Sequence, residues 1–195
     1  MPNYYDINSR QPHLLEFMMQ SVWNETQYTP LGQRHYSNTP YLLGEGQAMM
    51  YSFVPRTEVH RKIPGVPFGR VPFDYLRDNM VKTLDEKDVE FDFMLQLQTD
   101  PHAMPVENAA VRWPEELSPF IPAAKIRIPR QKFDSPARFE FARTLRIKPW
   151  QGLKEHRPLG NQNRARKRMY YELSALRMKM NDVSHEEPEG SEVFD

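Results

Sequence analysis

The sequence has no cysteine and no long hydrophobic run, and each absence excludes a class of protein. Without cysteine the chain forms no disulfides, thiolate nucleophiles, cysteine-ligated zinc sites or iron–sulfur clusters. No apolar run approaches the roughly 18 residues that a membrane-spanning helix needs. The first residues, MPNYYDINSRQ, lack the basic and apolar regions of a secretory signal. We therefore predict a cytoplasmic protein with no membrane partner.

The chain also has no net charge, because 26 basic residues balance 26 acidic ones. This balance argues against a protein that mainly coats nucleic acid, so we predict no nucleic-acid partner. The charges are nevertheless unevenly spread. Residues 125–181 contain 16 basic and 4 acidic residues, and residues 182–195 contain six acids and no base. The basic stretch predicts a site for an anionic ligand, and the acidic tail 182–195 is predicted to be disordered beside one domain, 1–181.

Four segments have the alternating pattern of β-strands. In 90–98, Phe91, Phe93, Leu95 and Leu97 alternate with mostly polar residues, which predicts a strand with one apolar face. Similar but shorter patterns occur at 34–39, 47–54 and 122–128. Together these strands favour an antiparallel sheet.

Four further segments have helical spacing of apolar residues or helix-start signals. They are residues 11–23, 72–84, 135–145 and 163–180. Ser135 and Pro136 are typical of an N-cap and a first helical turn. Helices interspersed with antiparallel strands predict an α+β fold.

The last of these helices has the most chemically informative pattern. Arg166, Tyr170, Ser174 and Arg177 fall at i, i+4, i+8 and i+11, and so form one stripe beside the apolar one. An adjacent guanidinium stabilises a phenolate, which otherwise forms only near the usual tyrosine pKa of about 10. The residues alone leave a second interpretation open, in which Tyr170 packs in the core and the arginines are solvated.

The segment EHRPLGNQNRARKRMYYELSALR, at 155–177, resembles the proximal haem motif of catalase-related haem proteins. Segments at 30–55, 90–120 and 126–150 resemble the same family in the same order. The resemblance implies the antiparallel β-barrel of the catalase type. Only the second half of that barrel and the C-terminal proximal haem helix are matched, so we expect 1–181 to be N-terminally truncated relative to the family.

Half a barrel leaves strand edges open, and open edges recruit another chain. We therefore expect self-association or a complementary N-terminal fragment as a partner. The third alternative is that other residues of the same chain cover the open strand edges.

The resemblance also implies a cofactor, haem b (iron protoporphyrin IX), with Tyr170 as the axial ligand of the haem iron, since catalases use tyrosinate there. Arg166 corresponds to the partner of the phenolate oxygen, Arg177 to an arginine near the haem edge, and Ser174 lies on the same stripe. Tyr171 is the adjacent alternative ligand. One residue rotates a side chain by about 100° on a helix, so only one of the two tyrosines faces the iron.

The distal histidine of the family precedes the matched region, and none of the six histidines lies in such a motif. No catalytic residue is therefore assigned. Two functions follow as hypotheses. The first is a haem-dependent oxidoreductase with peroxidase or catalase chemistry on hydrogen peroxide or an organic hydroperoxide. The second is a non-catalytic catalase-like fragment or assembly partner that lacks the distal haem machinery.

Overall fold

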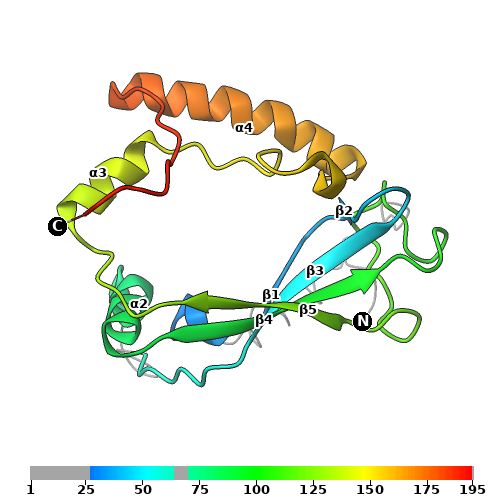
Figure 1. Ribbon diagram of the computed structural model, residues 1–195, viewed down its shortest axis with the longest axis horizontal. Coiled ribbons are helices and arrows are strands. Elements are labelled where there is room, and N and C mark those ends of the chain that lie inside the picture. Colours follow the sequence, from blue (N-terminus) through cyan, green and yellow to red (C-terminus); the bar gives the residue numbers. More distant parts are fainter. Residues whose placement is uncertain (1–26, 64–69, 195) are drawn as a thin grey trace.

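The computed structural model describes residues 27–63 and 70–194, which form an open antiparallel sheet with three α-helices (Figure 1). The helix predicted at 11–23 lies outside the described residues. The α+β class predicted from the sequence is confirmed.

The sheet has five strands in the order β1-β3-β4-β5, and β2 also pairs with β3. Their bounds are β1 His35–Tyr36, β2 Tyr41–Leu42, β3 Ala48–Pro55, β4 Val89–Leu97 and β5 Ile121–Ile128. All pairs are antiparallel, and Phe93 on β4 lies opposite Phe53 on β3 and Ala124 on β5. The four predicted strands are thus confirmed. The sequence does not predict β2, since two residues are too few to establish an alternating pattern.

Three α-helices match the remaining sequence predictions. They are α2 (Tyr75–Glu86), α3 (Pro136–Thr144) and α4 (Gly160–Asn181), with short 3₁₀ turns η1 (Pro30–Gly32) and η2 (Lys154–His156). The Ser135 hydroxyl accepts a hydrogen bond of 3.3 Å from the backbone N–H of Arg138, so Ser135 caps α3 as predicted. None of the helices in the described ranges is long and apolar enough to cross a bilayer.

The two faces of the sheet support two small cores. One contains Val89 and Phe91, which pack with Leu31, Val59 and Leu84. The other lies on the opposite face around Ala48, Met104 and Trp113. On that second face Gln96 is fully buried. Its side-chain amide is satisfied there, because it donates to the backbone carbonyls of Trp113 and Ser118. The nominally polar face of β4 is therefore partly core.

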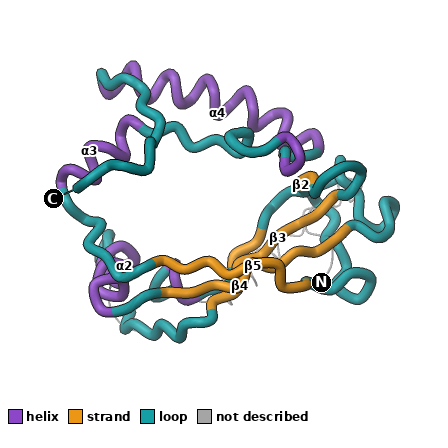
Figure 2. The backbone as a smooth tube through the Cα atoms, viewed as in Figure 1, coloured by secondary structure: helices purple, strands orange, loops and turns teal. Residues whose placement is uncertain are grey.

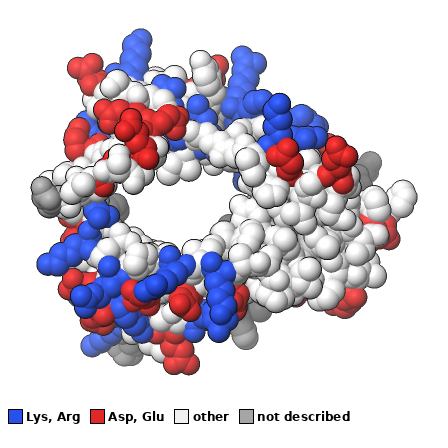
Figure 3. Space-filling view, in the orientation of Figure 1, with Lys and Arg blue, Asp and Glu red and all other residues white. Residues whose placement is uncertain are grey.

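Helices α3 and α4 form an arm that leaves the sheet and returns to it (Figures 1 and 2). At one end the N–H of Leu159 donates to the carbonyl of Pro40 at 2.9 Å, and at the other the N–H of Gln131 donates to the carbonyl of Leu84 at 2.8 Å. The space-filling view shows an opening between the arm and the sheet (Figure 3).

The described strands do not close into a barrel, which agrees with the expectation that only the second half of the family's barrel is present. Strand β5 pairs only with β4 among the described strands, and seven of its eight residues are exposed. The physical reason is that a barrel needs more strands to bring its first and last edges together. What the chain forms is an open sheet with β5 at its edge.

The apolar stripe of α4 is also more exposed than its spacing suggests. Met169, Leu173, Leu176 and Met180 are exposed, whereas the buried residues of the helix are Gly160, Asn163 and Met178. The helix contacts the rest of the fold mainly near its first turn and through Met178, so most of its length stands away from the sheet (Figure 1).

Residues 182–194 contain neither helix nor strand and run back along α3. The N–H of Glu186 donates to the carbonyl of Thr144 at 3.3 Å, and the rings of Phe194 and Phe141 lie 5.2 Å apart. The domain boundary at 181 and the disorder of the tail stay predictions.

Candidate functional site

Helix α4 is held against the sheet by the residues at its N-terminal end. The fully buried Asn163 side chain donates to the carbonyls of Pro40 and Leu159, at 3.2 and 2.7 Å. Gly160 begins the helix at φ +84°, where an added Cβ would collide with the carbonyl oxygen of Val106. This end of the helix therefore needs a residue without a side chain.

Three of the four predicted site residues line one cavity of about 540 Å³ beside α4. Tyr170, Ser174 and Arg177 contribute its polar groups, and its apolar walls are Ala142, Leu145, Ile147, Met169 and Leu173. Tyr170 is 40% exposed, so it does not pack in the core as one interpretation of the sequence allowed. No residue in the described part of the chain hydrogen bonds with its hydroxyl, which leaves that oxygen available to a ligand.

Arg166, the fourth predicted residue, does not line this cavity. Its guanidinium donates a long hydrogen bond of 3.4 Å to the Thr39 hydroxyl, next to the attachment point of the helix. The charge of Arg166 also reaches Tyr41 of β2 and acts on the pKa of that residue. Burial and a hydrogen bond with Tyr51 raise the pKa of Tyr41 to about 12, although the charge of Arg166 lowers it.

Ser174 and Arg177 are both held by backbone carbonyls. The Ser174 hydroxyl donates to the carbonyl of Tyr171 at 2.9 Å, one turn earlier in its own helix. The guanidinium of Arg177 donates to the carbonyl of Leu145, in the segment after α3. Arg177 is thus kept beside the cavity, whereas the Ser174 hydroxyl forms its hydrogen bond within α4.

A row of aromatic rings on the sheet was not found by sequence analysis as part of the site. Tyr41 packs on Tyr51 with ring centroids 5.1 Å apart, and Tyr51 lies 5.6 Å from Phe93. Phe53 and Phe93 stack at 5.3 Å. The alternation in β3 and β4 was a signal for this row, but its link to α4 through Tyr41 depends on the unpredicted β2.

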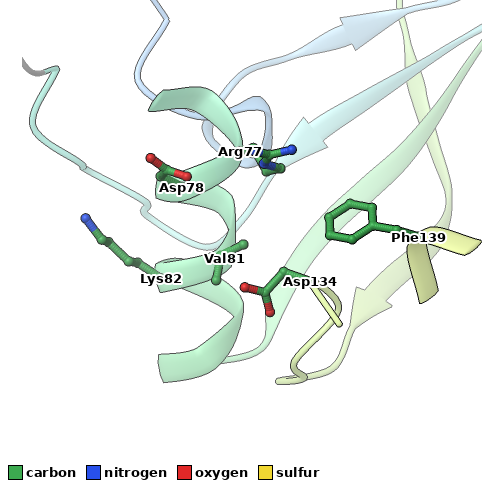
Figure 4. Close-up of a pocket in the computed structure, with 6 residues that line it drawn as sticks. All are labelled: Arg77, Asp78, Val81, Lys82, Asp134 and Phe139. Carbon is green, nitrogen blue, oxygen red and sulfur yellow. The ribbon is translucent and has the colours of Figure 1, made fainter. Parts of the chain in front are cut away.

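A separate cavity of about 410 Å³ lies between α2 and α3 (Figure 4). Its lining contains Arg77, Asp78, Val81, Lys82, Asp134 and Phe139. Arg77 pairs with Asp74 at 2.7 Å and also lies 5.8 Å from the ring centroid of Phe139. Because its two cations are balanced by two carboxylates and Arg77 is engaged within the fold, we assign this cavity no ligand.

No family model matches the sequence, and no curated protein matches it. Solved structures do match, and three of them are catalases. A fungal catalase has a TM-score of 0.61 at 14% identity over 80% of this chain, and catalase A from Saccharomyces cerevisiae has 0.63 at 15% over 87%. A bacterial catalase has 0.58 at 14% over 94%. The chain has a catalase-like fold.

At these identities the likeness concerns the fold alone. The chain spans 33%, 37% and 40% of the three catalase chains, in the same order. The fold of this chain therefore corresponds to one part of each of those longer chains.

No histidine of the described ranges lines the Tyr170 cavity. Among the described residues, His35 contacts the carbonyl of Pro30 at 2.7 Å, and His185 contacts Glu187 at 2.5 Å. The ring of His60 lies 5.8 Å from that of Tyr28. The lining of the Tyr170 cavity contains no histidine in the described ranges, and no group of three or more potential metal-ligating His, Asp or Glu residues is found there. The catalytic residue stays unassigned.

Proposed function

We propose that the chain binds haem b through the Tyr170 oxygen and supports oxidoreductase chemistry on hydrogen peroxide or an organic hydroperoxide. One observation carries the proposal: an exposed tyrosine hydroxyl, without a hydrogen-bond partner in the described residues, borders an apolar cavity on α4. The catalase-like fold supports it, because the three similar structures are catalases.

The residues around this cavity fit the chemistry of haem. Tyrosine oxygen is an established axial ligand of haem iron. Leu145, Ile147 and Leu173 supply the apolar surface that a porphyrin ring needs, and the cavity of about 540 Å³ lies within the range of cofactor pockets. Arg177 at its border would pair with a haem carboxylate.

Bound haem would supply the redox chemistry with peroxide, and the chain would bind and orient it. Tyr170 would present its phenolate to the iron. Arg166, one helical turn earlier, would stabilise that negative charge once its guanidinium left the long 3.4 Å hydrogen bond to Thr39. The leucine and isoleucine walls would exclude water from the ligand side. Since the described cavity lining has no histidine to move a proton, we expect only slow peroxide turnover.

The test is a haem titration followed by absorbance, with Tyr170→Phe and Tyr171→Phe as a matched pair. Each variant loses one hydroxyl on adjacent residues of α4 and keeps its ring. We expect the wild type and Tyr171→Phe to give the same tyrosinate-type ferric spectrum, and Tyr170→Phe to lose it. Unchanged haem affinity and spectrum in Tyr170→Phe would overturn the assignment, as would loss of the spectrum in Tyr171→Phe alone.

The second candidate function is that of a non-catalytic catalase-like fragment or assembly partner. The absence of histidine from the described lining and the open β5 edge favour it. Oxygen evolution from hydrogen peroxide, measured together with consumption of an organic hydroperoxide by haem-loaded protein, separates the two functions. Oxygen evolution that depends on Tyr170 supports the enzyme, and haem binding without peroxide turnover supports the fragment.

A further inference from the structure

A second cavity on α4 has a different chemical character from the first. It measures about 370 Å³ and combines cations with aromatic rings. Its lining contains Lys148, Trp150, Arg164, Lys167, Arg168, Tyr170 and Tyr171. No carboxylate is among these residues, so the cavity has a positive potential.

Two of the cations lie over aromatic rings. The ammonium of Lys167 lies 4.4 Å from the ring centroid of Trp150, and that of Lys148 lies 5.5 Å from the centroid of Tyr171. The Trp150 ring is itself fixed, because its N–H donates to the carbonyl of Asn163 at 3.4 Å. These rings and ammonium groups therefore sit together on a supported part of the fold.

Arg164 is the one cation of the group that already has an anionic partner. Its two terminal nitrogens lie 2.9 and 2.8 Å from the two carboxylate oxygens of Glu107. In the described part of the chain, no carboxylate forms an ion pair with Lys148, Lys167 or Arg168. Three positive charges thus remain for an external anion.

We propose that this cavity binds a small ligand that combines an aromatic ring with a phosphate, of the mononucleotide class. Three uncompensated cations exceed what one carboxylate needs and suit a phosphate dianion. The half-buried ring of Trp150 and the exposed ring of Tyr171 suit a planar ring, since bases stack on aromatic side chains. A cavity of about 370 Å³ is within the range of small-molecule sites.

Neighbouring acids favour a small anion over a nucleic-acid strand. Glu187 accepts a hydrogen bond of 3.1 Å from the side-chain amide of Gln151, which directly follows Trp150 of the cavity lining. Glu107 is paired with Arg164 at another part of the rim. Both carboxylates would repel the phosphates of a strand that continued beyond the cavity.

The test is calorimetric titration of the haem-free full-length chain with AMP, adenosine and inorganic phosphate. The variants are Lys148→Met and Lys167→Met, and the control is Lys179→Met, which removes the same charge near the other end of α4. We expect AMP to bind at least about tenfold more tightly than adenosine or phosphate. Each cavity variant should weaken AMP binding by about tenfold, because a charge-assisted contact is lost, and Lys179→Met should stay within about twofold.

Several results would overturn the proposal. Equal affinities for AMP and phosphate would exclude a role for the rings, and equal losses in Lys179→Met and Lys167→Met would indicate general charge attraction. Much tighter binding of a ten-nucleotide RNA than of AMP would replace the small ligand with a strand. Because no haem is added, failure here leaves the Tyr170 proposal intact, and loss of haem binding in Tyr170→Phe leaves this one intact.

Discussion

The Thr39 hydroxyl donates a hydrogen bond of 3.1 Å to the side-chain carbonyl of Asn163, 124 residues away in the sequence. Both side chains are buried, and the same Asn163 amide donates to the carbonyls of Pro40 and Leu159. This cluster ties the first turn of α4 to the loop before β2. The position of Tyr170, two turns later, therefore depends on Asn163.

We predict that Asn163→Ala lowers the free energy of unfolding by about 2–3 kcal/mol, because several buried groups lose their hydrogen-bond partner. Chemical denaturation of this variant and of Gln162→Ala measures the effect. Gln162 is exposed on the same turn, so its replacement should cost less than about 0.5 kcal/mol. Similar losses in both variants would show that the Asn163 cluster has no special role.

Gly160 supports the second stability prediction. Gly160 has φ +84° and lies against the carbonyl of Val106. Gly160→Ala therefore adds both backbone strain and a steric clash. We expect the variant to lose about 2 kcal/mol or more of stability. Gly152→Ala is the matched control, because no atom lies within 4 Å of its added Cβ and its φ is not positive. A drop in melting temperature confined to Gly160→Ala is the expected result, and equal melting temperatures contradict it.

Much of this fold was predictable because local patterns determine it. The alternation at Phe91, Phe93 and Leu95 predicted β4, and the Ser135–Pro136 pair predicted the start of α3. The stripe Arg166, Tyr170, Ser174 and Arg177 has helical spacing, but only the tertiary structure separates Arg166, which turns toward Thr39, from the other three.

What could not be predicted depends on contacts between distant segments. The two-residue strand β2 exists because β3 pairs with it, and the cation-rich cavity exists because Lys148 and Trp150 lie against α4. The exposure of Leu176 and Met180 is a third case, since an apolar stripe does not specify what covers it.

The Glu107–Arg164 pair should contribute to stability in a pH-dependent way. The Arg164 guanidinium beside Glu107 lowers the pKa of that carboxyl below its ordinary value of 4.5. A carboxyl with a lowered pKa in the folded state stabilises the fold above its ordinary pKa and loses this contribution as the pH falls through the lowered value. We therefore expect the coupling between the two residues to be present at pH 7 and to shrink below about pH 4.5.

A double-mutant cycle of Glu107→Gln and Arg164→Met, measured by urea denaturation at pH 7 and pH 3, isolates this coupling. Both side chains are exposed, so the coupling at pH 7 should be small and weakened by salt. A coupling that is equal at both pH values would contradict the prediction.

The last prediction concerns the open edge of the sheet. Strand β5 has no partner on its outer side among the described strands, and Ile121 at its start is 45% exposed. An unpaired strand edge recruits another strand, and a lysine in place of an exposed apolar residue, beside the Lys125 and Arg127 that β5 already has, weakens that pairing. We expect light scattering to give the 195-residue chain a mass above its monomer value of 23.1 kDa, and Ile121→Lys to return it toward that value. Leu153→Lys, which makes the same type of change at an exposed residue outside the sheet, should leave the association unchanged. A wild-type chain that is monomeric at high concentration would mean that the β5 edge is covered within a single chain.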